Sequence, residues 1–378
     1  MTPDAGGETR PRQRPAIRDP IRTASRLHDR ALAARSQGKF EEARALCARS
    51  LRILERESGP DHPDVANVLN TYGSIHLDLG RYTDAEPFFQ RSVRITADLS
   101  GDPDLERLRL QSLTGLAGCL RVQGRYRDAE PLFERALALA EAAFGPEDLE
   151  VSTVLNDWAI VYKYSGRFDR AEALYRRALA IIEKALGPEH VEVATIYHNL
   201  GGLEHSRGRY AAGEPHARRS VEIRAKALGP DHPDVAADVA ALAAILDALG
   251  KREEAEEMYR RALDVFETRL GQENYEVAVN LNNLAALHFS RGNSLLAEAF
   301  YWWALNVKEK MLGPNHPDVA MTLNNLAVLF KSQGKFDQAG PLFRRALTIF
   351  ESFLDSDHPK VVTCRENFED MVREQAQS

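Results

Sequence analysis

The sequence contains few cysteines and no long run of apolar residues. Its 378 residues include only three Cys, namely Cys47, Cys119 and Cys364. Their spacings are not those of a zinc site or a redox pair, so we expect three reduced thiols that pack as small apolar side chains. No stretch approaches the roughly 18 apolar residues that span a bilayer, and the N-terminus lacks the apolar core of a signal peptide. We therefore expect a cytoplasmic protein without a membrane partner.

Motifs for chemistry are also missing. The sequence has no Walker loop, no Gly-x-Gly-x-x-Gly after a strand, no His-Glu-x-x-His and no nucleophile elbow. A hidden hydrolase would need an acid, a base and a nucleophile that converge from distant segments, and the sequence gives no sign of them. We therefore expect no enzymatic activity, no catalytic or metal-binding residue and no cofactor.

The charge of the chain is unevenly distributed around a net value of −7. Residues 1–35 carry eight Arg and four acidic residues, so they contribute +4 and the rest of the chain −11. An acidic body argues against a nucleic-acid partner. We expect residues 1–20, which are rich in Arg and Pro, to form a disordered basic arm. Binding of an acidic partner or RNA by this arm is the alternative.

A repeat with a period of 42 residues runs through the chain. A Gly followed by a basic residue or Asn, called the marker Gly below, recurs in steps of 42 residues with a single step of 44. Such a period indicates a repeat array rather than separate compact domains. The marker glycines are Gly38, Gly80, Gly124, Gly166, Gly208, Gly250, Gly292 and Gly334.

Each unit of the repeat is predicted to contain two helices. In the last unit, apolar residues from Val319 to Phe330 have the spacing of one helix face, and the same spacing returns from Ala339 to Phe350. Gly334 separates the two stripes and suits the end of a helix. A second turn, often with the sequence Gly-Pro, follows half a period later and separates the units.

A short apolar pattern recurs in the units, and in the last one it reads Leu323-x2-Leu326-Ala327-x2-Phe330, then Ala339-x3-Phe343. This pattern resembles the tetratricopeptide repeat. The 42-residue unit, with Leu-Asn-Asn-Leu-Ala in its first helix and Gly-Pro-x-His-Pro-Asp between units, closely resembles the repeats of kinesin light chain and nephrocystin-3. The resemblance implies an all-α, right-handed solenoid of eight helix-turn-helix repeats over residues 21–357. A C-terminal capping helix and tail would follow over residues 358–378.

Histidines recur beside acidic residues at the junctions between units. A metal ion needs ligand atoms about 2 Å from one point, whereas equivalent positions of stacked helices lie at least roughly 8–10 Å apart. We therefore expect each of these side chains to cap the helix that follows it. They are His62, His190, His232, His316 and His358.

Asparagine recurs ten or nine residues before the marker Gly. Equivalent positions of a solenoid stack along its inner groove, and an amide that both donates and accepts can pair with the backbone of an extended peptide. In kinesin light chain, matching Asn residues line the cargo-peptide groove, so the resemblance implies the same role here. The alternative is that these amides only tie neighbouring repeats together. With polar neighbours, the predicted groove residues are Asn70, Asn156, Lys163, Tyr164, His198, Asn199, Asn282, Asn283, Asn324, Asn325 and Lys331.

The predicted groove has polar and apolar segments. Repeats four and five, and again repeats seven and eight, contribute polar side chains, whereas repeat six presents Ala237, Ala240, Ala241 and Ala244. We therefore expect a peptide with acidic or polar ends and a hydrophobic residue over repeat six.

The second helix of repeat seven is unusually apolar on its outer face. Trp302 and Trp303 stand where repeats four, six and eight have two Arg, and Leu295 and Leu296 replace Asp337 and Gln338 of repeat eight. Exposed aromatic residues often mark protein contacts. These four residues are therefore a second candidate interface, including one for self-association. Local repacking against the next repeat is the alternative.

Together, these features predict a non-enzymatic scaffold or adaptor that binds an extended peptide segment of a partner protein in the inner groove. The alternative is a peptide- or ligand-sensing regulatory subunit of a signalling or enzymatic complex.

Overall fold

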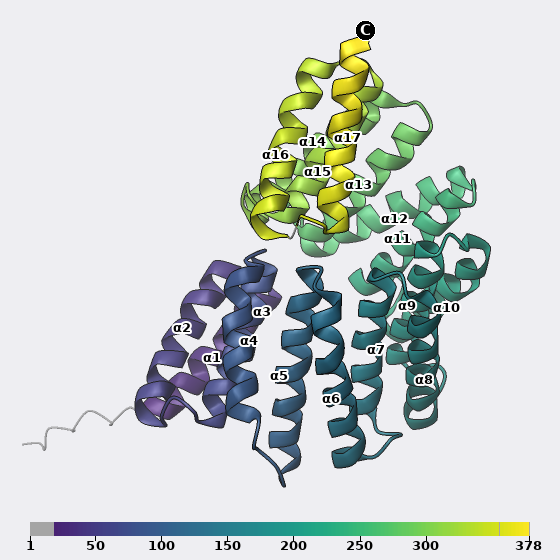
Figure 1. Cartoon of the computed structure of the whole chain (residues 1–378). Helices are drawn as coiled ribbons and strands as arrows, with labels where there is room; N and C mark the ends of the chain where they lie inside the picture. Colours follow the sequence, from purple (N-terminus) through teal and green to yellow (C-terminus); the bar gives the residue numbers. More distant parts are fainter. Residues whose placement is uncertain (1–18, 355, 378) are drawn as a thin grey trace, which may run out of the picture.

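A computed structural model describes residues 19–354 and 356–377, and this part of the chain consists of α-helices without a β-strand. Eight antiparallel helix pairs follow one another, and a single helix ends the array (Figure 1). The all-α repeat fold predicted from the sequence is confirmed. The helices are α1 (Pro20–Ser36), α2 (Phe40–Glu57), α3 (Pro63–Asp78), α4 (Tyr82–Thr96), α5 (Pro103–Val122), α6 (Tyr126–Phe144), α7 (Leu149–Tyr164), α8 (Phe168–Leu186), α9 (Val191–Ser206), α10 (Tyr210–Leu228), α11 (Pro233–Ala248), α12 (Arg252–Leu270), α13 (Tyr275–Ser290), α14 (Ser294–Leu312), α15 (Pro317–Ser332), α16 (Phe336–Phe353) and α17 (Pro359–Gln377).

The helical array begins at Pro20 and ends with α17. The basic arm predicted for residues 1–20 lies outside the described residues, except for Asp19 and Pro20. Pro20 is the first residue of α1, and the Asp19 carboxylate accepts hydrogen bonds from the N–H groups of Ile21 and Arg22. At the other end, α17 occupies the predicted capping position and packs against α16.

The predicted helix boundaries follow from caps and glycines. In repeat eight, Pro317 opens α15, and the N–H of Asp318 donates to Nδ1 of His316 over 3.0 Å. After α15, Gly334 has a φ of 69°, a conformation that favours glycine. The capping role predicted for the junction histidines is confirmed, because each Nδ1 accepts from the N–H two residues further on. This holds for His62, His190, His232, His316 and His358.

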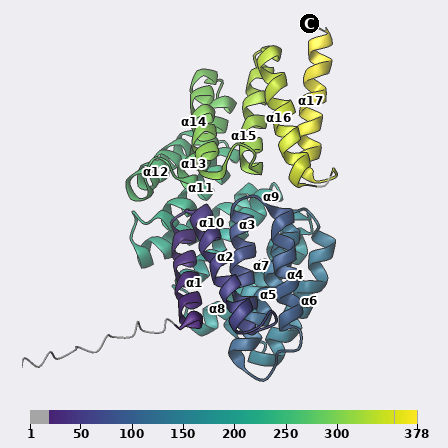
Figure 2. The same ribbon diagram turned by 90° about the vertical axis from the view of Figure 1, so that its left-hand side faces the viewer.

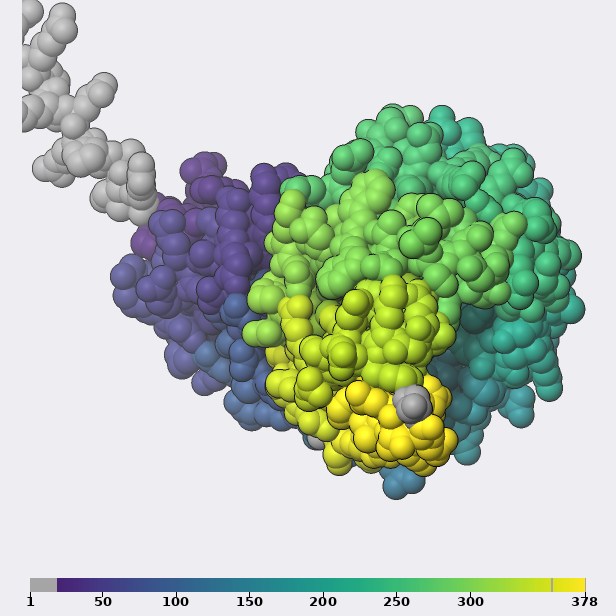
Figure 3. All heavy atoms as spheres, turned by 90° about the horizontal axis from the view of Figure 1, so that it is seen from above, coloured from purple at the N-terminus to yellow at the C-terminus, as the bar shows by residue number. Residues whose placement is uncertain are grey.

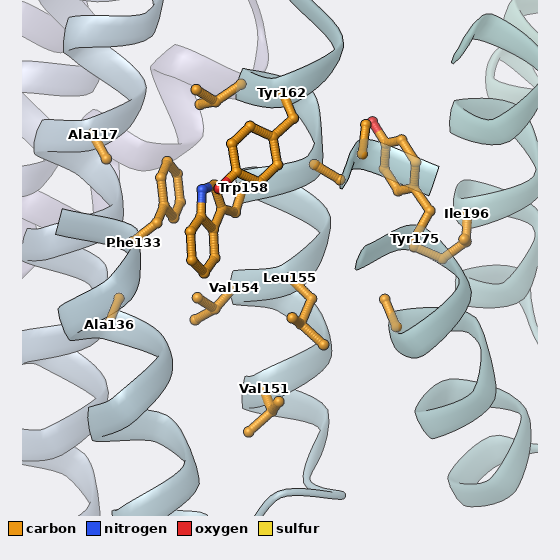
Figure 4. Packing of buried hydrophobic residues seen from close by; sticks show 14 of the residues in the cluster. Ala117, Phe133, Ala136, Val151, Val154, Leu155, Trp158, Tyr162, Tyr175 and Ile196 are labelled. Atoms are coloured by element: carbon orange, nitrogen blue, oxygen red, sulfur yellow. The ribbon is translucent and has the colours of Figure 1, made fainter. Parts of the chain in front are cut away.

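In most repeats, a large aromatic residue of the second helix packs against first-helix residues of its own repeat and of the next. Phe89 of α4 is an example, because a Cβ placed on Gly73 of α3 or on Gly115 of α5 would lie 2.7 Å or 2.6 Å from its ring. Phe133 of α6 likewise stacks on Trp158 of α7, with ring centroids 6.3 Å apart (Figure 4). In these repeats, one aromatic ring thus packs against the next repeat.

The cysteines belong to this core. Cys47, Cys119 and Cys364 are buried free thiols, as predicted. Burial raises the pKa of each thiol to about 12. They therefore remain protonated at neutral pH and act as packing groups.

The solenoid turns far enough for its last repeats to lie over its first. Figures 1 and 2 show α13–α17 stacked above the ends of the N-terminal helices, and Figure 3 shows the same packing from above. The ring of Tyr82 lies 6.3 Å from that of Phe353. A Cβ on Gly80 would lie 2.5 Å from the imidazole of His316, and one on Gly124 would meet His358. We call this the closure contact; it comprises Gly80, Tyr82, Gly124, His316, Phe353 and His358.

Candidate functional site

The odd-numbered helices line the inner side of the solenoid. Each of them contacts the odd-numbered helix of the next repeat, from α1 and α3 to α15 and α17. In the described part of the chain, the even-numbered helices show no such extended contact with one another. A stack of helix pairs curves toward the side on which its members are closer. The predicted Asn positions, which lie on α3, α7, α9, α13 and α15, therefore belong to the inner face.

Hydrogen bonds join the asparagines from one repeat to the next. Asn199 donates to Asn156 over 2.7 Å, Asn325 donates to Asn282 over 3.3 Å, and Asn367 of α17 donates to Asn324 over 3.2 Å. In each pair, the amide Nδ2 of the later residue meets the Oδ1 of the earlier one. These amides therefore tie neighbouring repeats together, as the alternative from the sequence proposed.

These bonds use only part of the capacity of each amide. An Asn side chain has two N–H donors and an oxygen with two lone pairs. Asn283 forms no hydrogen bond with the described residues, and Asn282 and Asn324 keep their Nδ2 groups free of protein partners. Asn70 differs, because it is buried and donates to Ser112 over 3.1 Å. Peptide binding by these side chains stays a prediction, with Asn283 the most available of them.

Two cations and an exposed aromatic ring lie together on α5 and α7. The ring of Tyr164, which is 55% exposed, has the Arg121 guanidinium 5.7 Å and the Lys163 ammonium 5.4 Å from its centroid. Burial and the nearby Arg121 charge lower the pKa of Lys163. Among the described residues, neither cation forms an ion pair with a carboxylate. This part of the groove therefore suits an acidic or π-rich group.

Arg121 was not predicted as a groove residue, although the sequence contains a signal for it. Arg121, Lys163, His205 and Lys331 all stand three residues before a marker Gly. Arg121, Lys163 and His205 therefore form a row along the inner face, whereas Asp247 and Phe289 stand at this position in repeats six and seven. Lys331 is less available to a bound peptide, because its ammonium lies 3.0 Å from the Glu374 carboxylate of α17.

His198 belongs to a buried polar network that was not predicted from the sequence. Its Nδ1 lies 2.8 Å from Oδ1 of Asp238, whose side chain is fully buried. The other carboxylate oxygen accepts from the hydroxyl of Ser220 over 2.5 Å and lies 3.3 Å from Nε of Arg224. Asp238 thus holds the imidazole of His198 in place at the groove surface. Most other repeats have an apolar residue, Ser or Thr at the position of Asp238, which was the available signal.

The outer patch on α14 is exposed as predicted. Leu295 is 85% exposed, and Leu296, Trp302 and Trp303 are exposed as well. Repacking against the next repeat therefore does not cover these side chains in the single chain. A protein contact or self-association through this patch stays a prediction.

Other types of site find little support in the described part of the chain. No group of three or more His, Cys, Asp or Glu residues there could hold a metal ion. None of the helices described is both long and apolar enough to span a bilayer.

Comparisons with known proteins identify the repeat. A family model described as tetratricopeptide repeat matches residues 22–98, 108–184, 150–219, 192–268, 276–352 and 318–378, and a second, described as tetratrico peptide repeat, matches residues 237–301.

The chain is similar to several solved structures. The apo form of RapI is 14% identical, with 76% of this chain and 98% of that chain covered and a TM-score of 0.56. A Rap protein complexed with Competence and Sporulation Factor is 15% identical, with 94% and 99% covered and a TM-score of 0.54. A putative kinesin light chain repeat protein from Podosopora anserina is 24% identical, with 55% and 97% covered and a TM-score of 0.45.

Proposed function

Because the chain belongs to the tetratricopeptide repeat family, we propose that it is a protein-interaction scaffold whose inner groove binds an extended peptide segment of a partner protein. Repeats of this family generally mediate contacts between proteins. The observation that carries the proposal is the asparagine amides on the inner face of repeats four and five and of repeats seven and eight, which keep donors and acceptors free. Such a row can pair with a peptide backbone whatever its side chains.

The charges of the groove support a particular class of peptide. Neither Arg121 nor Lys163 forms an ion pair with the described residues, although the charge of Arg121 acts on the Asp157 carboxylate. Both cations lie beside the exposed ring of Tyr164. An acidic residue of the peptide would neutralise them in a partly desolvated place, where a charged hydrogen bond contributes more than on an open surface. We therefore expect a peptide that is acidic near repeats three and four.

The alternative function, a peptide- or ligand-sensing regulatory subunit, is favoured by the closure contact. The inner groove lies along the same helices whose ends meet across this contact, so a bound segment that widens the groove would pull His316 away from Gly80. Small-angle scattering with and without a bound peptide separates the two functions. A scaffold keeps its radius of gyration, whereas a sensor changes it.

Screening a peptide array with the purified chain tests the main proposal. We expect the variant with Asn283→Ala and Asn325→Ala to bind the selected peptides at least about tenfold more weakly, because two hydrogen bonds of about 1 kcal/mol each are lost. Asn293→Ala is the matched control, since Asn293 is exposed in a turn and its side chain does not cap α14. Unchanged affinity in the double variant would overturn the groove assignment.

A further inference from the structure

Repeat five lacks the aromatic ring that fills the space between neighbouring repeats elsewhere. Nine residues after the marker Gly, every repeat from two to eight except the fifth has Phe or Tyr, and all these side chains are buried. They are Phe89, Phe133, Tyr175, Tyr259, Tyr301 and Phe343. The fifth repeat has Ala217 at this position.

The missing ring leaves a pocket. Phe89 shows where such a ring lies, because it contacts Gly73 of its own repeat and Gly115 of the next. The residues at the equivalent positions around Ala217 are Gly201 and Ala241, which are also small. A pocket of about 240 Å³ is present here, lined by residues of α7, α9, α10 and α11.

The walls of the pocket divide into an apolar and a polar side. Ala217, Ala241, Ala244 and Ile245 form the apolar side, which is continuous with the alanine surface of repeat six. The polar side consists of Lys163, His198, His205, Ser206, Ser220 and Asp238. In the neutral imidazole of His198, Nδ1–H donates to the Asp238 carboxylate, and Nε2 is then the hydrogen-bond acceptor. This Nε2 has no hydrogen-bond partner among the described residues.

We propose that this pocket binds one aromatic side chain of the peptide in the groove, with tyrosine or tryptophan preferred over phenylalanine. The inference rests on the proposed function and names the residue that the groove selects. Six other repeats have a Phe or Tyr of the chain itself at the position of Ala217. At Ala217, α9 and α10 approach closely, because a Cβ on Gly201 would lie 3.3 Å from Cβ of Ala217. The ring of a bound peptide would therefore enter from the groove side, over Ala241 and Ala244. A phenol O–H or an indole N–H supplies the donor that Nε2 of His198 lacks. Aromatic anchors in desolvated pockets often dominate binding energy.

Small probes test the pocket independently of any natural partner. N-acetyltyrosinamide and N-acetyltryptophanamide are titrated against the full chain and followed by nuclear magnetic resonance, with N-acetylleucinamide as the comparison. We expect the two aromatic amides to bind at least about tenfold more tightly than the leucine amide. His198→Ala should remove the preference for tyrosine over phenylalanine, tested with N-acetylphenylalaninamide.

Filling the pocket provides the decisive variant. Ala217→Phe restores the ring of the other repeats and should abolish binding of the aromatic amides, while Ala217→Ser, which leaves the space open, should retain it. Ala241→Leu fills the pocket from the groove side and replaces Ala217→Phe if that variant fails to fold. Thermal unfolding verifies that each variant is folded.

The outcomes separate this inference from the proposed function. If selected peptides lose affinity in the Asn283→Ala and Asn325→Ala variant but bind equally well to Ala217→Phe, the groove stands and the pocket assignment is wrong. If aromatic amides bind only to the open-pocket forms and no peptide binds, the pocket stands and the peptide groove is wrong. Equal binding of aromatic and leucine amides would overturn the aromatic preference.

Discussion

Lys308 is a charged residue at a position that belongs to the core. The equivalent residues of repeats six and eight are Phe266 and Phe350, and both are buried. Lys308 is also buried, and its ammonium donates to the hydroxyl of Thr322 over 3.0 Å and to the backbone oxygen of Asp318 over 3.4 Å. Burial is the main cause that lowers the pKa of Lys308 to about 8. The buried charge therefore lowers the free energy of unfolding at neutral pH.

We expect Lys308→Met to raise the free energy of unfolding at pH 7 by about 2 kcal/mol, because an apolar side chain replaces a desolvated charge. The wild-type chain should gain stability as the pH rises from about 8 to about 10.5, since its folded form binds fewer protons than its unfolded form in that range. The difference between the two proteins should therefore shrink above pH 8. Chemical denaturation across this pH range measures it.

Lys310→Met is the control, because Lys310 is exposed and forms only an exposed ion pair with Glu273. Its stability should stay within about 0.5 kcal/mol of wild type. A Lys308→Met variant that is less stable than wild type at pH 7 would show that the two hydrogen bonds outweigh the cost of burial.

Residue-scale features of the groove could be predicted only in part. The regular spacing of the Asn residues predicted that they lie on one face. Their hydrogen bonds, such as the one from Asn199 to Asn156, join residues 43 positions apart and depend on side-chain geometry that the spacing does not determine. The pocket at Ala217 was harder to foresee, because it arises from an absence. Only the packing of Phe89 between two helices shows what a missing ring leaves open.

At the scale of one helix, α14 has lost an ion pair that other repeats possess. Eleven residues after the marker Gly, Arg91, Arg177 and Arg345 each lie 2.5 Å from a Glu of the preceding even-numbered helix. In α14, Trp303 takes this place, and Oε1 of Glu267 is buried without a hydrogen-bond partner. The exposed indole thus replaces a stabilising ion pair. This replacement favours a role of Trp303 in binding rather than in stability.

We expect Trp303→Arg to restore the ion pair with Glu267 and to raise the midpoint of thermal unfolding, by an amount that corresponds to about 0.5–1 kcal/mol. Trp303→Gln is the control, since it removes the indole without supplying a positive charge for Glu267. If the patch also joins two copies, wild type should form dimers in sedimentation equilibrium, and the variant with both Trp replaced should be monomeric. A lower midpoint for Trp303→Arg would contradict the ion-pair explanation.

At the scale of the whole molecule, the period of the sequence determines that a solenoid forms but not how tightly it coils. The marker glycines and the caps at His62 and His316 give the number and the ends of the helices. The coil depends on a small rotation added at each repeat, which the packing of rings such as Phe133 against Trp158 determines. The closure contact joins residues about 240 positions apart, such as Gly80 and His316, and no local pattern reveals it.

The closure contact can be opened by side chains placed where the chain has glycine. Gly80 and Gly124 have φ values of 69° and 80°, and a Cβ on either would clash with the imidazole of His316 or His358. Gly334 and Gly292 have nearly the same φ values, 69° and 78°, but a Cβ there would have no neighbour within 4 Å. Asn tolerates this backbone conformation better than most residues, so the local strain of Gly→Asn should be the same in both pairs.

We therefore expect the variant with Gly80→Asn and Gly124→Asn to open the superhelix, whereas the variant with Gly292→Asn and Gly334→Asn should keep it closed. Small-angle scattering should show a larger radius of gyration only for the first, and its midpoint of thermal unfolding should be the lower of the two, because buried apolar surface around Tyr82 and Phe353 becomes exposed. Equal radii and equal midpoints would mean that the contact adds no stability beyond the repeats. If the open variant binds groove peptides more tightly than wild type, closure opposes binding. In wild type, part of the binding free energy would then be used to open the superhelix.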